Sequence, residues 1–402
     1  GRREHAGAIT VVTPDLGPNE PAAEKCINKE PVFRDPFPIS ETLFLVAREN
    51  RLLLMDGKGM TQELYRAEKF VHEPRPIRPR SREHPLPSRT DERQATGTLI
   101  LQDVYAGRNM VGVEQGEIKK LLILESLPKP VNHSGGMDIV SDLGTFTLER
   151  VLGTVPVDPD GSAHFELPAN RPFFFAALDE KDLSVKRMQS FVSVLPGERT
   201  SCLGCHEPRS RAPALPGRTA VKAAQRPPSQ VERFAGLPDV IDFPRHVQPI
   251  LNRNCVGCHN YEKRSGGVVL VKDYGARKGM RRFTQGYWSL LLRRQFTDGG
   301  NKYGNRAPRA IGSSASPLMQ KIMTKHHGVA LSEDERRVVW MWLETGAVYA
   351  GTYAELLTTQ GPRVSGRAFG IMKNRCASCH SKDGMKLPTE IHGVRPHYYR
   401  VI

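Results

Sequence analysis

The chain lacks any apolar run near the roughly 20 residues that a membrane-spanning helix requires, although 39% of its 402 residues are hydrophobic. We therefore expect no transmembrane segment. Its first residues, Gly1-Arg-Arg-Glu-His5, contain neither an initiator methionine nor the apolar centre of a signal peptide. Its last residues, 398–402, stop inside a short apolar run. We expect the chain to be a piece of a longer protein.

Cysteine is scarce outside one repeated pattern. Six of the seven cysteines belong to three copies of Cys-x-x-Cys-His, at Cys202/Cys205/His206, Cys255/Cys258/His259 and Cys376/Cys379/His380. In this pattern both cysteines form thioether bonds to a c-type haem, and the histidine ligates the iron. A redox dithiol or half of a zinc site does not need a histidine directly after the second cysteine. The repetition predicts three covalently attached haem c groups, in preference to buried or disulfide-bonded cysteines.

The seventh cysteine, Cys26, lies outside this pattern. Haem c is attached outside the cytoplasmic membrane, so we expect an exported, periplasmic or extracellular protein whose leader has been removed. A single thiol in an exported protein is either a buried side chain or a ligand to a metal such as zinc. Both alternatives stay open for Cys26.

Acidic residues are too few to balance the basic ones. The chain has 58 lysines and arginines against 43 aspartates and glutamates, which gives a net charge of +15. No basic helix, finger or stripe of interleaved aromatic residues concentrates this charge, so nucleic acid is not an expected partner. Arginines beside haem propionates, a basic face for acidic redox proteins, or a scattered solvated surface each explain it. We expect redox partners, in particular acidic cytochromes, and either homo- or hetero-oligomers.

The predicted fold is multidomain α+β, with folding regions separated by proline-rich basic linkers. The chain is predicted to begin with a β-meander that is the remnant of a β-propeller (1–72), followed by a Pro/Arg-rich linker (73–95). Next come a β-sandwich-like domain that ends in the first motif (96–206) and a basic Pro-rich linker (207–238). The last two regions are an α-helical cytochrome c-like domain with the second haem (239–352) and the start of a second such module with the third haem (353–402).

Strand patterns fill the first half of the chain. Strands are predicted at 44–48 and 51–56, joined at Glu49-Asn50, with a third strand near 63–65. In the middle domain the predicted strands are 97–105, 118–124, 146–152, 153–157, 163–167, 173–178 and 191–195. The last of these directly precedes the first motif, so we expect the first haem at the edge of the β domain.

Helical patterns surround the second motif. Pro249 suits the first turn of a helix, and Leu251, Cys255 and Cys258 then fall on one face. Ser332-Glu-Asp-Glu335 is a capping box that should open a closing helix. The apolar stripe of that helix is predicted to be core: Val338, Val339, Trp342, Leu343 and Ala347. The third motif repeats the opening, with Ala368, Met372, Cys376 and Cys379 on one face.

The ligand on the far side of each iron separates electron carriers, which have two strong ligands, from sites with an open or weak position. For the second haem, the candidates are Met319, Met323, His326 and His327, and we expect one of the two histidines. For the third haem they are His392 and His397. For the first haem they are His133 and His164, although His164 also fits a half-buried strand residue beside Phe165.

Several runs resemble hydrazine synthase alpha subunits and their multihaem relatives. The resemblance covers about 35–355 and rests on Leu152–Val157, Asp160–Ala163, Pro196–Glu198, Ser201–Glu207, Val247–Leu251, His326–Ser332, Trp342 and Gly351–Tyr353. It implies a β-propeller, a β-rich middle domain with a reactive haem, and a C-terminal domain whose haem is ligated by His259 and His326. It also implies an anammoxosome-like compartment.

The sequence departs from this family at two points. The resemblance implies a tyrosine four residues after the first motif's histidine, which frees that histidine to hold zinc with a distant cysteine, for which Cys26 is the candidate. Ser210 stands at the tyrosine position, and a third haem motif is present. We therefore expect an exported triheme cytochrome that carries electrons. The alternatives are a nitrogen-cycle redox enzyme with a reactive haem at Cys202/Cys205, and a structural or filament-forming cytochrome.

Overall fold

The computed structural model describes residues 6–13, 15, 21–80, 82, 84–85, 87–107, 109–129, 147–188, 190–204, 221–273, 283–296, 306–353 and 355. The described part of the chain forms two compact units, one of which ends at Ser88 while the other begins at Arg89. Each unit has its own apolar core, and each is presented separately below.

The first unit is built on a four-stranded antiparallel sheet with the strand order β3-β4-β5-β6. Its strands are β3 (Arg34–Ser40), β4 (Leu43–Arg48), β5 (Arg51–Asp56) and β6 (Thr61–Arg66), and a separate ribbon pairs β1 (Thr10–Val12) with β2 (Glu24–Cys26). The predicted hairpin is confirmed, because Arg48 pairs with Arg51 across a two-residue loop. Glu49 has a positive φ of 55°, as such tight hairpin loops require. The described strands form an open sheet.

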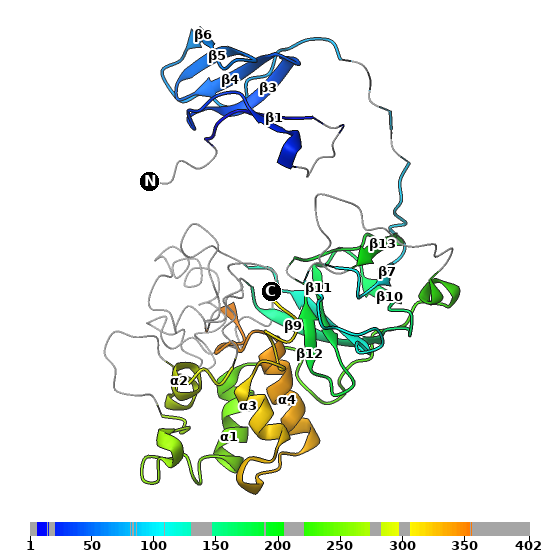
Figure 1. Ribbon diagram of the computed structural model, residues 1–402, viewed down its shortest axis with the longest axis vertical. Coiled ribbons are helices and arrows are strands. Elements are labelled where there is room, and N and C mark those ends of the chain that lie inside the picture. Colours follow the sequence, from blue (N-terminus) through cyan, green and yellow to red (C-terminus); the bar gives the residue numbers. More distant parts are fainter. Residues whose placement is uncertain are drawn as a thin grey trace, which may run out of the picture. The chain divides into compact units, whose positions relative to one another are not determined.

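The second unit begins with two sheets that pack face to face (Figure 1). One has the order β12-β11-β8-β9 and the other β10-β7-β13. Their bounds are β7 (Thr96–Asp103), β8 (Lys120–Ser126), β9 (Glu149–Pro156), β10 (Ala163–Pro168), β11 (Phe173–Leu178), β12 (Ser184–Arg187) and β13 (Arg199–Gly204). The rings of Phe165 and Phe175 meet edge to face between the sheets, with centroids 5.4 Å apart.

Three details of this β region differ from the predictions. The segments 146–152 and 153–157 are parts of one strand, β9, which passes through Gly153 at a φ of +142°. A Cβ at Gly153 would lie 2.0 Å from the carbonyl oxygen of Glu232, so glycine lets that segment lie directly against the strand. The predicted strand 191–195 makes only an isolated bridge at Val192. The strand that leads into the first motif is instead β13, which pairs in parallel with β7.

Helices and short turns follow in the second half of the unit. The helices are α1 (Gln248–Asn254), α2 (Gln285–Leu292), α3 (Pro317–Met323) and α4 (Glu333–Glu344), and a π-helical turn, η4 (Phe243–Val247), leads into α1. Short 3-10 turns lie at η2 (Pro21–Ala23) in the first unit and, in the second, at η3 (Lys222–Gln225), η5 (Ser265–Gly267) and η7 (His326–Gly328). Within the described residues, none of the helices combines the length and apolar character needed to cross a membrane.

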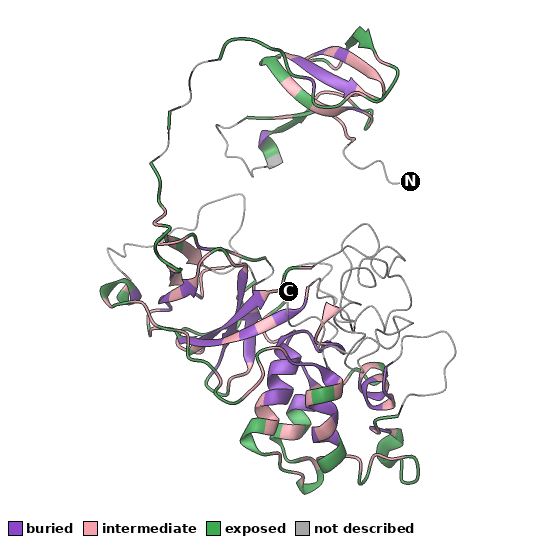
Figure 2. Ribbon diagram, turned by 180° about the vertical axis from the view of Figure 1, so that it is seen from behind, coloured by how far each residue is buried: buried purple, intermediate pink, exposed green. Residues whose placement is uncertain are grey.

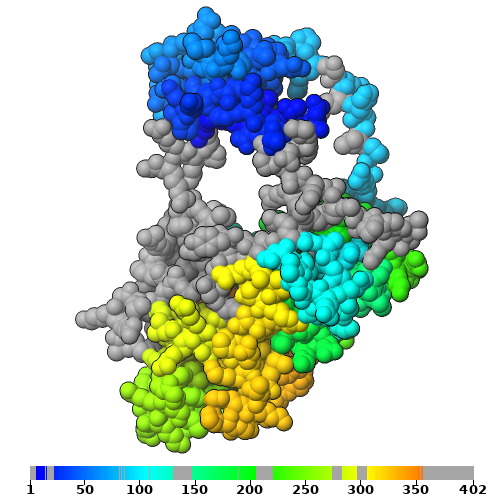
Figure 3. All heavy atoms as spheres, in the orientation of Figure 1, coloured from blue at the N-terminus to red at the C-terminus, as the bar shows by residue number. Residues whose placement is uncertain are grey.

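The sheet β12-β11-β8-β9 is covered on both faces. Leu121 and Ile123 of β8 belong to the cluster between the two sheets, whereas Leu122 and Leu124 belong to the cluster shared with the helices. Figure 2 shows β11 and much of α4 as buried, and Figure 3 shows strands and helices of this unit forming one continuous surface. A strand buried on both faces needs apolar residues at every position, which explains the run Leu121-Leu-Ile-Leu124.

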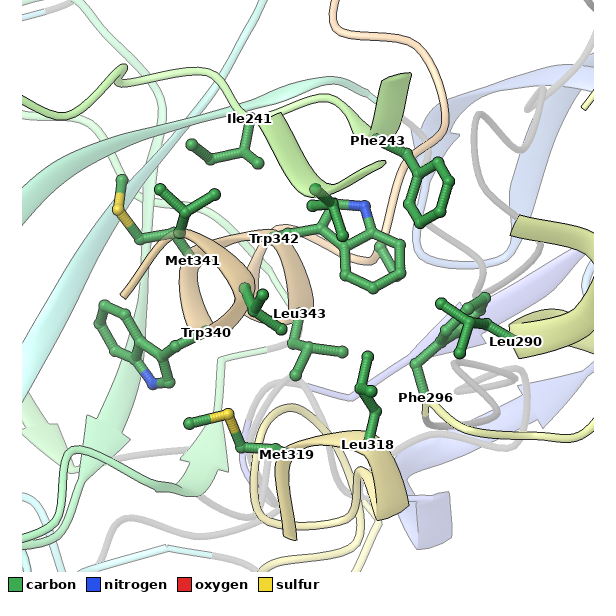
Figure 4. Packing of buried hydrophobic residues seen from close by; sticks show 14 of the residues in the cluster. Ile241, Phe243, Leu290, Phe296, Leu318, Met319, Trp340, Met341, Trp342 and Leu343 are labelled. Carbon is green, nitrogen blue, oxygen red and sulfur yellow. The ribbon is translucent and has the colours of Figure 1, made fainter. Parts of the chain in front are cut away.

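Helix α4 confirms the predicted capping box and most of the predicted apolar stripe. Its capping box is complete, since the side chains of Ser332 and Glu335 each accept the other's backbone N–H. All five residues of the predicted stripe are buried, but α4 ends at Glu344, so Ala347 lies beyond the helix, with a φ of 49°. Trp342 is fully buried and donates from Nε1 to the carbonyl of Val348 at 2.8 Å. Figure 4 shows Leu343 of α4 directed toward Leu318 of α3.

Candidate haem-binding site

The second motif forms a compact turn at the end of α1. The helix stops at Asn254, and the N–H of His259 then bonds to the carbonyl of Cys255 at 3.0 Å. The predicted helical face through Cys258 is therefore wrong, because the turn rather than the helix sets the positions of the cysteines. Leu251 is buried, Cys255 is half-buried and Cys258 is exposed. The turn places both sulfur atoms and the imidazole on neighbouring parts of one short segment.

The half-buried cysteine lies in apolar surroundings. Cys255 packs against the core that α1 and α4 share. Burial, with smaller contributions from Glu335 and Cys258, raises the pKa of its thiol to about 11. An uncharged sulfur is therefore favoured at this position, and a thioether meets that requirement.

A strained turn presents His326 to His259. Lys325 and His327, on either side of His326, both have positive φ angles, 53° and 51°. Residues other than glycine pay about 1–3 kcal/mol each for such angles, and they tend to cluster at functional positions. The rings of His259 and His326 lie 6.2 Å apart between centroids, with 17° between their planes.

This geometry fits two imidazoles on opposite sides of one metal ion. A metal–imidazole bond of about 2 Å, plus roughly 1.2 Å from the nitrogen to the ring centre, places two opposed centroids about 6.4 Å apart. Nδ1 of His259 is buried, which leaves Nε2 as the nitrogen that can reach a metal. Burial, together with His327, His259 and Lys321, lowers the pKa of His326, so its neutral, ligating form is favoured.

The remaining metal ligands must come from outside the side chains of the described residues. Among these, no group of three or more His, Cys, Asp and Glu side chains is placed to hold a metal ion. Two opposed imidazoles beside two cysteines are the protein's share of a haem c site, since the porphyrin supplies the other four nitrogens. The residues at Cys255, Cys258, His259 and His326 therefore fit a haem c.

The other candidates for the second haem lie elsewhere. Met319 is fully buried within the core, and Met323 is 36% exposed at the end of α3. His327 is exposed, and its ring lies 4.2 Å from the ring of His326. Of the two adjacent histidines, His326 is the one whose ring lies across from the ring of His259, with centroids 6.2 Å apart.

At the first motif, the sheet places Cys202 and its candidate distal ligand, His164, on opposite faces. Cys202 on β13 and Ala163 on β10 are both in register with Leu101 of β7, and Cys202 packs against the core between the sheets. His164 follows Ala163 and so points to the opposite face. There it is buried, with Nδ1 3.2 Å from the carbonyl oxygen of Arg226.

Comparison with known proteins now places the chain. A family model described as the hydrazine synthase alpha subunit middle domain matches residues 116–207. Hydrazine synthase subunit alpha from Kuenenia stuttgartiensis is 24% identical over a 283-residue alignment, which covers 53% of this chain and 34% of that protein. The chain is related to the hydrazine synthase alpha subunit.

The solved Kuenenia stuttgartiensis hydrazine synthase is similar in fold to this chain. The TM-score is 0.67 at 18% identity, and the match covers 87% of this chain and 59% of the solved one. The chain thus spans about a third of the length of the curated relative. The matched family region, 116–207, starts before β8 and ends just after the first motif.

Several predicted site residues lie outside the described residues. They are Cys205, His206, Ser210, His133 and the whole third motif with its candidate ligands, Cys376, Cys379, His380, His392 and His397. Cys26 is described. It is exposed at the end of β2, and its Sγ donates to the carbonyl of Asn28 at 2.9 Å.

Sequence reasoning missed a second role of Glu335. Its capping-box position was recognised, but its carboxylate also accepts hydrogen bonds from Arg253 and Asn254 on α1. Burial raises the pKa of Glu335, but hydrogen bonds from Ser332, Arg253 and Asn254 outweigh it and hold that pKa below its ordinary value. The only available signal was the polar Arg253-Asn254 pair directly before Cys255.

Proposed function

We propose that the chain is an exported c-type cytochrome, related to the hydrazine synthase alpha subunit, that carries electrons through three covalently bound haems. The observation that supports this most is the opposition of His259 and His326 beside Cys255 and Cys258, at 6.2 Å between ring centroids. Bound haem c supplies a one-electron iron couple. With His259 and His326 both available as iron ligands, such a site would favour electron transfer over the binding of a substrate.

Each residue of the second motif's site has a distinct role in the proposal. Cys255 would attach the haem on the side of the core, and Cys258 would attach it on the exposed side of the turn. His259 and His326 would both ligate the iron, which would leave no position for a small molecule. Leu251 beneath the turn is buried, so the attachment segment rests on a packed support.

Other parts of the proposal rest on the sequence alone. The first and third haems follow from Cys202/Cys205/His206 and Cys376/Cys379/His380. We propose a β-propeller fragment for the sheet β3–β6 and a cytochrome c-like domain for α1–α4. Export follows from haem c attachment, to a periplasmic or anammoxosome-like compartment. The net charge of +15 supports acidic redox partners, and an assembly with other subunits is in keeping with the relationship.

The test of this proposal is a pair of neighbouring substitutions in the complete holoprotein. His326→Ala should open one axial position and convert one low-spin haem to high-spin, as measured by electron paramagnetic resonance. Added imidazole should restore the low-spin signal. His327→Ala, the matched control, should leave that signal in place. If His327→Ala converts the haem and His326→Ala does not, the ligand is wrong by one residue, and if neither does, the two-histidine site is wrong.

A further inference from the structure

Glu335 is connected to the helix that carries the second motif. Its Oε1 accepts from Nη2 of Arg253 at 2.9 Å and from Nδ2 of Asn254 at 3.3 Å. Asn254 directly precedes Cys255 and closes back on the carbonyl of Ile250 at 3.0 Å. One carboxylate oxygen thus holds the end of α1 at the point where the haem attachment begins.

The other oxygen holds the segment that brings in His326. Oε2 of Glu335 accepts from the backbone N–H of Ser332 at 3.1 Å, and Oγ of Ser332 accepts from the N–H of Glu335 at 3.2 Å. Ser332 ends the short connection that starts at η7, where His326 lies. The two oxygens of one side chain therefore contact both sides of the site, the side of Cys255 and the side of His326.

The contacts between Glu335 and α1 contribute too little free energy to explain why the residue that caps α4 also binds α1. Arg253 has 60% of its side chain exposed, and an exposed ion pair of this kind contributes about 0–1 kcal/mol. The Glu335 side chain is only 18% exposed. Its carboxylate accepts hydrogen bonds from Arg253 and Asn254 of α1 and from the N–H of Ser332, which caps α4. We therefore attribute to Glu335 a positioning role, because the ligands of a metal site must be held within about 0.5 Å of their working positions.

We infer that Glu335 is a positioning residue for the second haem, which fixes the separation of His259 and His326 and places one negative charge beside Cys255. This rests on the proposed function. A negative charge near the haem stabilises the oxidised iron, so Glu335 should lower the reduction potential of that haem, and Arg253 should raise it.

The test compares substitutions in the complete holoprotein, with haem content checked by mass in each. The signal of the second haem is first identified as the one lost in the Cys255→Ala/Cys258→Ala double variant. Glu335→Ala should shift its midpoint potential to a more positive value and raise its high-spin fraction. Glu335→Gln should also shift the potential upward, whereas Arg253→Gln should shift it downward.

Two controls separate positioning from helix stability. Glu333→Gln removes a charge from the same turn of α4, but Glu333 pairs with Arg336 and Arg337 and not with α1, so the potential should stay unchanged. Ser332→Ala removes the other half of the capping box and lowers thermal stability, while the contact from Glu335 to α1 remains. If Glu335→Ala lowers stability as Ser332→Ala does and moves neither potential nor spin state, Glu335 is only a cap. If the wild-type protein shows no low-spin haem at this motif, the proposed function fails instead.

Discussion

The first and second haem motifs share one residue pattern but stand on different backbones. Cys255 follows the last residue of α1, in a turn closed by backbone hydrogen bonds. Cys202 lies inside an edge strand, β13, with its side chain against the core between two sheets. The first cysteine of the pattern therefore follows a helix end at one motif and lies within a strand at the other.

The difference shows that the attachment motif and the distal ligand are supplied by different segments of the chain. Attachment needs only residues that are adjacent in sequence, so both backbones can provide it. The ligand on the far side comes from another segment. At the second motif the turn at 325–327 brings His326 opposite His259. At the first motif the alternation of β10 directs His164 to the face opposite Cys202.

The largest effect is expected from removing one attachment site. The intact protein should exceed the polypeptide mass by three haems and stay coloured after denaturation, because thioether bonds survive unfolding. Cys255→Ala combined with Cys258→Ala should remove one haem, as measured by intact mass. A wild-type mass with two haems would remove one motif from this account.

Carbon monoxide should distinguish the two motifs directly. Added to the reduced protein, it should bind at most one haem, the one at Cys202, because under the proposed function His259 and His326 would both ligate the second iron and leave no position for carbon monoxide. Optical difference spectra of the wild type and the Cys255→Ala/Cys258→Ala variant measure this. Binding at the second haem would reverse the roles assigned to the two sites, and no binding at all would mark a pure electron carrier.

A buried ion pair within the β region also contacts the end of α4, and breaking it should cost about 3–5 kcal/mol. Arg187 donates to both carboxylate oxygens of Glu149 at 2.7 Å and also to the carbonyl of Glu344 at the end of α4. Arg187→Ala should leave Glu149 buried without its partner, as measured by denaturant unfolding.

The deficit of Arg187→Ala should also depend on pH. Burial raises the pKa of Glu149 despite the opposing effect of Arg187, with Glu344 adding to the increase. A raised folded-state pKa favours the fold below the unfolded pKa and disfavours it as the pH rises. Without Arg187 that pKa rises further, so the deficit should grow as the pH rises from the ordinary pKa of a glutamate toward the raised one. A deficit that shrinks over this range would contradict the assignment.

The smallest effect sharpens the comparison with a matched pair of leucines. Leu251 lies beneath Cys255, and Leu101 lies beside Cys202, and each is at most 3% exposed. Both Leu251→Ala and Leu101→Ala should destabilise the protein by about 2–5 kcal/mol, through the cavity each leaves. Only Leu251→Ala should disturb the low-spin signal of the second haem. If Leu101→Ala disturbs that signal equally, the two sites are not supported independently.

Local features were predictable from the sequence. The three motifs, the hairpin at Glu49-Asn50, the capping box of Ser332 and Glu335, and the buried stripe of α4 each depend on residues within a few positions of one another. Such patterns determine local backbone and chemistry without reference to the rest of the chain. The sequence alone therefore indicated haem attachment and the two structural types of region.

Only the tertiary structure decided how distant segments meet. The parallel pairing of β13 with β7, the burial of β8 on both faces and the placement of the His326 ring across from His259 all depend on packing between remote parts of the chain. Arg253 and Glu335 stand 82 residues apart in sequence, and no local period relates them. Glu335 can complete the capping box of α4 from local sequence alone. Its second contact, to Arg253 and Asn254, exists only because α1 packs beside the start of α4.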